Sequence, residues 1–235
     1  MRTRPAAELL TLGGRVPPSV GGLILALVGA SLVGHLTGLA AWGTLLPSAV
    51  LEGEVWRLAT WTFLERDPLS LLFAALMLFS FGRDLAWAWG SRRLFLTWLG
   101  FGAASGVVAV LLSLAFPMPG WSGPWAVISA FMVAWGLLFP ERQMSFWGVL
   151  PLSGRNLVWL TIGITGFLGA FYGMRSMVPH LAAEGLMLLW FRGLSLRGAW
   201  QSVRIWLGER RMRRRAKHLR VVKKNGKGDP PQWMN

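Results

Sequence analysis

The sequence predicts an all-α, polytopic membrane protein built as a bundle of six transmembrane helices. The chain of 235 residues is 54% hydrophobic and only 14% charged, whereas a soluble domain carries about a quarter charged residues. Its apolar residues gather in long runs, most of them near the roughly 20 residues that a helix needs to cross a bilayer. Lys and Arg concentrate in alternate connections between these runs, which is typical of a multi-pass protein.

Six apolar runs along the chain are each predicted to form one span. The first follows Arg2, Arg4 and Arg15 and is longer than the apolar core of a signal peptide, about 7–15 residues, so we interpret it as an uncleaved helix. The fourth and sixth runs are short, which fits helices that begin below the membrane surface under a polar pocket. The predicted spans are 19–41, 69–89, 94–116, 122–139, 156–173 and 178–191.

The distribution of positive charge predicts the orientation of these spans. With a cytoplasmic N-terminus, the cytoplasmic segments hold 21 Lys and Arg residues and the outer loops hold 3. The positive-inside rule therefore places both termini in the cytoplasm, and we expect a plasma (inner) membrane protein. Three regions are predicted: a cytoplasmic N-terminus (1–18), a membrane domain (19–192) and a basic cytoplasmic tail (193–235) that is partly helical and then disordered.

The formal net charge of +14 raises the question of nucleic-acid binding. However, 13 of the 24 Lys and Arg residues lie from Arg192 onward, after the last span. A basic segment beside a membrane is typical of contact with anionic lipid, or it fixes topology. We therefore expect the lipid bilayer as a partner, with anionic lipid at the tail, and no nucleic acid.

Ser122 lies between glycines in Gly120-Trp121-Ser122-Gly123, at the start of the fourth span. The glycines allow a tight turn and a close approach of a substrate backbone. A turn that runs into a helix also offers free N–H groups to an oxyanion. The alternative is that Ser122 caps the fourth helix, with Pro124 in the first turn.

His180 is the natural base for Ser122, because the other two histidines lie in the first span (His35) and in the tail (His218). The predicted topology puts Ser122 and His180 at the outer ends of their helices, on one side of the membrane. An ionisable group within a span indicates function, because its burial is costly. The alternative is an interfacial histidine that caps a helix start after Pro179.

Glu184 follows His180 by one helical turn on the same face. Its carboxylate is expensive to bury unless it is paired or protonated. Two interpretations remain open: Glu184 orients His180 as the third member of a triad, or it bonds a neighbouring helix. Small residues at positions 126, 130 and 134 predict close packing of the fourth helix against another helix.

The chain resembles the rhomboid family of intramembrane serine proteases over about residues 20–192. GEVWRLATWTFL is similar to the Trp-Arg loop after the first helix, which includes Trp56 and Arg57. GWSG matches the GxSG motif, and HLAAEG is similar to the helix-six histidine motif. Two further segments also resemble the family, SFGRDLAWAWGSRRLFLTWLGFGAASG and FPERQMSFWGVLPLSGRNLVWL.

This resemblance implies a pocket that opens outward and peptide-bond cleavage by a Ser122–His180 dyad, with no metal or cofactor. The substrate would be a transmembrane helix unwound near its outer end. The family usually has a histidine and, four residues later, an asparagine early in helix two, where this chain has Ser70 and Ala74. Loss of an oxyanion donor costs about 10²–10³ in rate, although Ser70 or the backbone N–H of Ser122 can substitute.

Two functions follow from this altered site, and a third remains open. The first is an intramembrane serine endopeptidase, with Gly120, Gly123, Ser70 and Glu184 as supporting residues. The second is a rhomboid pseudoprotease that binds transmembrane helices without cutting them. A transporter or lipid-handling protein is the third, although apart from Glu184 the spans hold few charged residues for a solute path.

Overall fold

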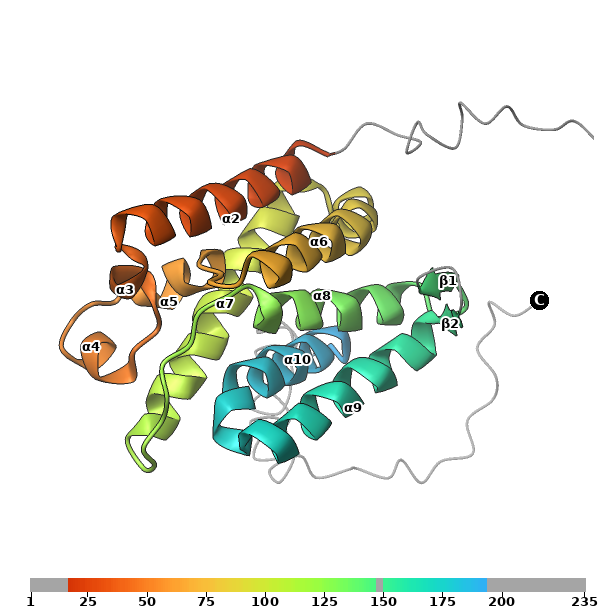
Figure 1. Cartoon of the computed structure of the whole chain (residues 1–235). Coiled ribbons are helices and arrows are strands. Elements are labelled where there is room, and N and C mark those ends of the chain that lie inside the picture. Colours follow the sequence, from red (N-terminus) through yellow and green to blue (C-terminus); the bar gives the residue numbers. More distant parts are fainter. Residues whose placement is uncertain (1–16, 147–149, 194–235) are drawn as a thin grey trace, which may run out of the picture. The chain divides into compact units, whose positions relative to one another are not determined.

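The computed structural model describes residues 17–146 and 150–193 (Figure 1). The chain separates into the units Met1–Arg192 and Gly193–Asn235, and the described fold belongs almost entirely to the first. The predicted tail, apart from Gly193, and nearly all of the predicted N-terminal segment lie outside the described residues. The elements are α2 (Pro18–Thr37), α3 (Ala40–Gly43), α4 (Pro47–Leu51), α5 (Arg57–Thr60), η1 (Trp61–Phe63), α6 (Pro68–Trp89), α7 (Ser91–Ser113), α8 (Trp125–Leu138), β1 (Gln143–Phe146), β2 (Leu150–Ser153), α9 (Gly154–Tyr172), η2 (Met174–Met177) and α10 (Val178–Phe191).

A helix occupies each of the six predicted spans, namely α2, α6, α7, α8, α9 and α10. In the described part of the chain, three of them are long and apolar enough to cross a membrane: α2, α6 and α7. The apolar helix α8 has only 14 residues. The mostly helical, membrane-type fold is therefore confirmed, while the number of crossings stays a prediction.

The largest boundary differences from the sequence prediction occur in three helices, each beside a glycine with a positive φ. Helix α7 is Ser91–Ser113 instead of 94–116, because Gly90, with a φ of 85°, ends α6 and is followed directly by α7. Helix α2 ends at Thr37 instead of residue 41, because Gly38 has a φ of 73° and closes the helix in the left-handed conformation. Helix α8 begins at Trp125 instead of residue 122, because Gly123 has a φ of 110°, which no α-helix contains.

Helix α8 is the central element of the fold. It contacts α6, α7, α9 and α10, and Figure 1 shows it between α6 on one side and α9 and α10 on the other. Ala126, Ala130 and Ala134 have no exposed surface. The small-residue stripe therefore lies in helix contacts, as close packing requires.

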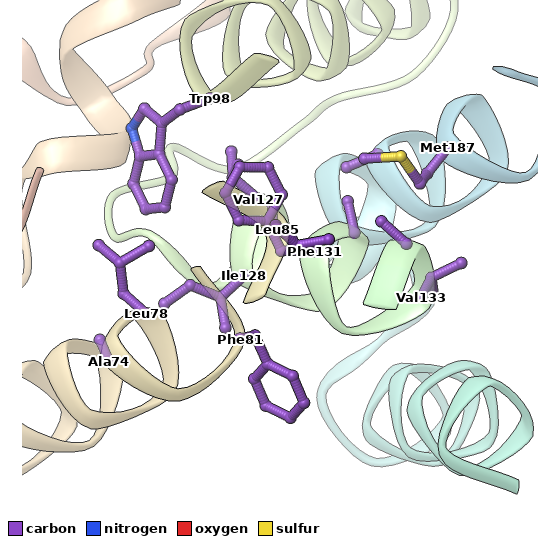
Figure 2. Close-up of a cluster of buried hydrophobic side chains, with 14 of the residues drawn as sticks. Ala74, Leu78, Phe81, Leu85, Trp98, Val127, Ile128, Phe131, Val133 and Met187 are labelled. Carbon is purple, nitrogen blue, oxygen red and sulfur yellow. The ribbon is translucent and has the colours of Figure 1, made fainter. Parts of the chain in front are cut away.

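Large side chains from several helices fill the core around α8 (Figure 2). Phe131 of α8 meets Trp98 of α7 edge to face, with ring centroids 5.8 Å apart. Phe81 of α6 meets Trp135 in the same way at 5.7 Å. Edge-to-face pairs add about 0.5–1.5 kcal/mol each beyond the area that they bury, so these contacts fix α6 and α7 against α8.

The two ends of the bundle are held differently. At one end, called the hairpin end, β1 and β2 form an antiparallel hairpin between α8 and α9. Asp84, near the end of α6, accepts a hydrogen bond from Trp135 Nε1 at 2.9 Å. It also forms an ion pair with Arg142 Nη1 at 2.9 Å. Both bonds converge on one oxygen, Oδ2, and join the ends of α6 and α8.

The other end, called the loop end, is formed by the connection between α2 and α6. This connection folds into α3, α4, α5 and η1 rather than one extended loop. Arg57 is buried there, and its Nη1 donates to the carbonyls of Ala41 at 2.6 Å and Thr44 at 2.7 Å. Its Nε also bonds Glu54. Trp56 is half exposed and donates to the Trp42 carbonyl.

Candidate functional site

The Gly120–Gly123 turn lies between α7 and α8 and is held by the loop end. Trp121 pairs with Leu45 through two backbone hydrogen bonds of 2.8 and 3.0 Å. The backbone N–H of Gly123 donates to the Trp61 carbonyl at 2.9 Å. The turn is therefore fixed by the α2–α6 connection before α8 begins.

The two glycines of the turn are both approached closely by the protein's own side chains. A Cβ at Gly120 would lie 2.6 Å from Leu46 Cδ2, and a Cβ at Gly123 would lie 2.9 Å from Glu65 Oε2. Their small size therefore has a packing explanation. A role of Gly120 or Gly123 in supporting an oxyanion stays a prediction.

Ser122 is half-buried in this turn and does not cap α8. Pro124 occupies the N-cap position, and no side chain bonds the free N–H groups there. The interpretation of Ser122 as an N-cap is therefore wrong. Gly123, with a φ of 110°, and Pro124 separate the serine from the first residue of the helix.

His180 lies in the first turn of α10, directly after Pro179. The N-cap position belongs to Met177, and no side-chain capping bond is formed there, so the histidine is not a cap. Its Nδ1 is buried and lacks a hydrogen-bond partner within the described residues. A buried polar atom without a partner is uncommon and calls for an explanation.

Ser122 and His180 belong to segments that contact each other, but the two side chains are not bonded. Trp121 Nε1 donates to the Ser176 carbonyl at 2.8 Å, which ties the turn to η2 immediately before α10. Both residues are described by the structure, and no hydrogen bond links the Ser122 hydroxyl to the His180 imidazole. The expected dyad bond is therefore not formed in this structure.

Ser70 lies in the first turn of α6. The sequence analysis gave it as a possible substitute for the oxyanion-binding histidine of the rhomboid family. Its backbone N–H donates to the cap residue Asp67 at 2.6 Å. Its hydroxyl oxygen accepts a bond from Trp125 Nε1 at 2.7 Å. The serine thus links α6 to the start of α8. Ala74, one turn later, is fully buried in the core.

Glu184 is buried in α10, with 2% of its surface exposed. Thr165 of α9 donates to its Oε1 at 2.6 Å. Its Oε2 has no partner in the described part of the chain. Of the two open interpretations, the structure shows the bond to a neighbouring helix. It shows no bond to His180.

A cavity of about 530 Å³ lies beside these groups, and we call it the His180 cavity. Its walls come from α6, α8, α9 and the start of α10. Most lining side chains are apolar, and the polar ones are Ser129, Thr161, Thr165 and His180. Ser122 does not line it. The sequence analysis missed the two threonines, although their spacing of four residues places them on one face of α9.

The long apolar helices α2, α6 and α7 are those of an integral membrane protein. The chain matches the family described as eukaryotic integral membrane protein (DUF1751) over residues 21–191. It therefore belongs to this family, which is part of the rhomboid-like superfamily. No match was found among the curated proteins.

Proposed function

We propose that this protein is a non-enzymatic, rhomboid-like membrane protein that binds transmembrane helices of other proteins in the His180 cavity. The observation that carries this proposal is that His180 lines an apolar cavity between helices without a bond to Ser122. The histidine then serves as a hydrogen-bonding group for a bound helix instead of a base for a nucleophile.

The walls of the His180 cavity suit a docking helix. Met77 of α6, Met132 of α8 and Ile164 of α9 face the same space. Methionine adapts to partners of different shape. The volume of about 530 Å³ accommodates a few side chains of a helix that lies against α6 and α9. In a bilayer, packing and interhelical hydrogen bonds drive such association.

Groups that a serine protease needs are engaged elsewhere or missing, which also supports a binding function. A general base must reach the hydroxyl at about 2.6–3.2 Å, and no such bond joins Ser122 to His180 within the described residues. The Ser70 oxygen is occupied by Trp125. Ala74 has no donor to offer.

The second candidate function is intramembrane proteolysis, and one contact favours it. The bond from Trp121 to the Ser176 carbonyl holds the serine turn against η2, the short helix directly before α10. Catalytic hydrogen bonds are often long before substrate binds. In that case Ser122 Oγ attacks a substrate carbonyl, and His180 takes the serine proton and passes it to the leaving amine. Water then releases the acyl-enzyme.

Helix binding is tested with a fluorescent transmembrane peptide and donor-labelled protein in liposomes, by energy transfer. Met132→Trp fills the His180 cavity, and overpacking of about 1–3 kcal/mol predicts binding weaker by at least about fivefold. Leu160→Trp is the matched control, because Leu160 lies on α9 outside the cavity and is 39% exposed. Equal binding by the Met132→Trp variant and the wild type contradicts the proposal.

A fluorophosphonate probe separates the two candidate functions. We expect the wild-type protein to remain as unlabelled as the Ser122→Ala variant. Labelling of the wild type at Ser122, abolished in both Ser122→Ala and His180→Ala, would replace the binding function with the proteolytic one.

We also propose six crossings with both termini in the cytoplasm of a plasma-membrane protein, and anionic lipid as the partner of the basic tail. The chain has no cysteine, so single cysteines report topology directly. A membrane-impermeant maleimide should label Glu52→Cys in intact cells and Glu141→Cys only after permeabilisation. The reverse pattern would invert the topology.

A further inference from the structure

A second cavity, of about 480 Å³, lies at the hairpin end of the bundle, and we call it the Arg155 cavity. It is lined by the last turns of α8 and α10 and by the first turns of α9. Helix α8 runs from the serine turn to this end, so the Arg155 cavity and the serine turn lie at opposite ends of α8. None of its lining residues belongs to the His180 cavity.

Two arginines stand at the Arg155 cavity. Arg155 comes from the first turn of α9, and Arg192 follows the end of α10. Both are exposed, and neither forms an ion pair with a described residue. Nearby Arg142 differs, because it pairs with Asp84. The cavity therefore carries two positive charges that its described surroundings do not neutralise.

The rest of the cavity wall is apolar and continues along the helices. Ile162 lies about two turns from Arg155 along α9, and Leu188 lies about one turn before Arg192 in α10, at about 3.6 residues per turn. Trp159 stands between them on α9 and is 71% exposed. Tryptophan of this kind is enriched where a membrane meets water. A charged end and an apolar wall thus share one cavity.

We infer that the Arg155 cavity binds an anionic phospholipid. Arg155 and Arg192 hold the headgroup phosphate, and the wall of Trp159, Ile162 and Leu188 holds the start of an acyl chain. Arginine forms paired hydrogen bonds to phosphate oxygens, and basic pockets between transmembrane helices on the cytoplasmic side suit anionic headgroups. The proposed topology places this end at the cytoplasmic leaflet.

The charge pattern selects this ligand over other occupants. A free inorganic anion gains nothing from the apolar wall, and an apolar helix gains nothing from two arginines. Only an amphiphile uses both parts. The volume of about 480 Å³ falls in the ordinary range of small-molecule sites, about 300–1,000 Å³. This site is also independent of the basic tail, because its residues precede Gly193.

The test is native mass spectrometry of the full chain with phosphatidylglycerol and phosphatidylcholine of identical acyl chains. Each arginine near a membrane surface contributes about a fivefold preference for anionic lipid. Arg155→Gln and Arg192→Gln should each lower the affinity for phosphatidylglycerol by about fivefold and the double variant by about 30-fold. Arg155→Lys should retain most of the binding.

Arg92→Gln is the matched control, because Arg92 is exposed in the first turn of α7 and does not line the cavity. Ile162→Trp fills the apolar part of the cavity and should weaken the binding of phosphatidylglycerol. Inorganic phosphate should not compete with phosphatidylglycerol for the site. An Arg92→Gln loss as large as that of Arg155→Gln would overturn the site. Full competition by inorganic phosphate would overturn the lipid as its ligand.

Discussion

Two carboxylates of the bundle, Asp84 in α6 and Glu184 in α10, have different numbers of hydrogen-bond and ion-pair partners. Asp84 receives the indole of Trp135 and the guanidinium of Arg142 on a single oxygen. Glu184 receives Thr165 on one oxygen, while its other oxygen has no partner among the described residues. The first carboxylate uses two donors to tie α6 to the end of α8, whereas the second has a buried oxygen without a partner and is bonded to Thr165, a residue that lines the His180 cavity.

This difference separates structure from function within one fold. A carboxylate that receives two donors from neighbouring residues contributes mainly to stability, because its removal leaves those donors unpaired. A carboxylate with an oxygen that receives no donor contributes less to stability and can accept a hydrogen bond from a group that reaches it. Polar groups within membrane spans are commonly functional for the same reason. The two residues therefore make opposite predictions for stability and for binding.

Asp84→Ala should produce the largest loss of stability. It leaves the indole of Trp135, which is only 1% exposed, without its acceptor, and we expect a loss of about 2 kcal/mol. Arg142 adds little, because its side chain is 52% exposed. Thermal unfolding in detergent measures the effect. Asp84→Asn keeps an acceptor for Trp135 and should lose clearly less stability than Asp84→Ala. Equal losses in the two variants would assign the effect to the charge of Asp84 instead of the hydrogen bond.

Gly123→Ala should have the next largest effect, at the serine turn. An L-residue in a left-handed conformation costs about 1–2 kcal/mol, and Glu65 must move away from the new Cβ. The same unfolding experiment measures this loss. Gly100→Ala is the control, because nothing lies within 4 Å of its Cβ position in α7. A Gly123→Ala variant as stable as the control would contradict the geometry of the turn.

Glu184→Gln should have the smallest effect on stability, below about 1 kcal/mol, because an amide oxygen also accepts the Thr165 bond. Its effect should fall instead on helix binding, measured by energy transfer with the transmembrane peptide. A stability loss as large as that of Asp84→Ala would remove the distinction between the two carboxylates.

The positions of the helices were predictable because apolar runs carry the information locally. The span predicted at 178–191 coincides with α10 (Val178–Phe191). The errors at α2, α7 and α8 arose beside glycines with a positive φ, which hydrophobicity alone does not reveal. The short helices α3, α4 and α5 and the hairpin of β1 and β2 were not predicted, because their segments are short and stabilised by tertiary contacts.

The candidate site was predictable only in part. Sequence motifs selected Ser122, His180 and Glu184 as candidate site residues, and each has a definite place in the structure. The partners of these residues depend on which helix faces which, so the bond between Thr165 and Glu184 could not be read from spacing. The bond between Trp125 and Ser70 likewise joins residues 55 positions apart. Such pairs follow from the packing of α8 against its neighbours.

The most direct test of the central claim follows a single transmembrane peptide through binding and recovery. The peptide is incubated with the protein in liposomes, its binding is measured by energy transfer, and its mass is then determined. We predict that the wild-type and Ser122→Ala proteins bind it equally and return it intact. A cleaved peptide with the wild-type protein, and an intact one with Ser122→Ala, would contradict the account and establish Ser122 as a nucleophile.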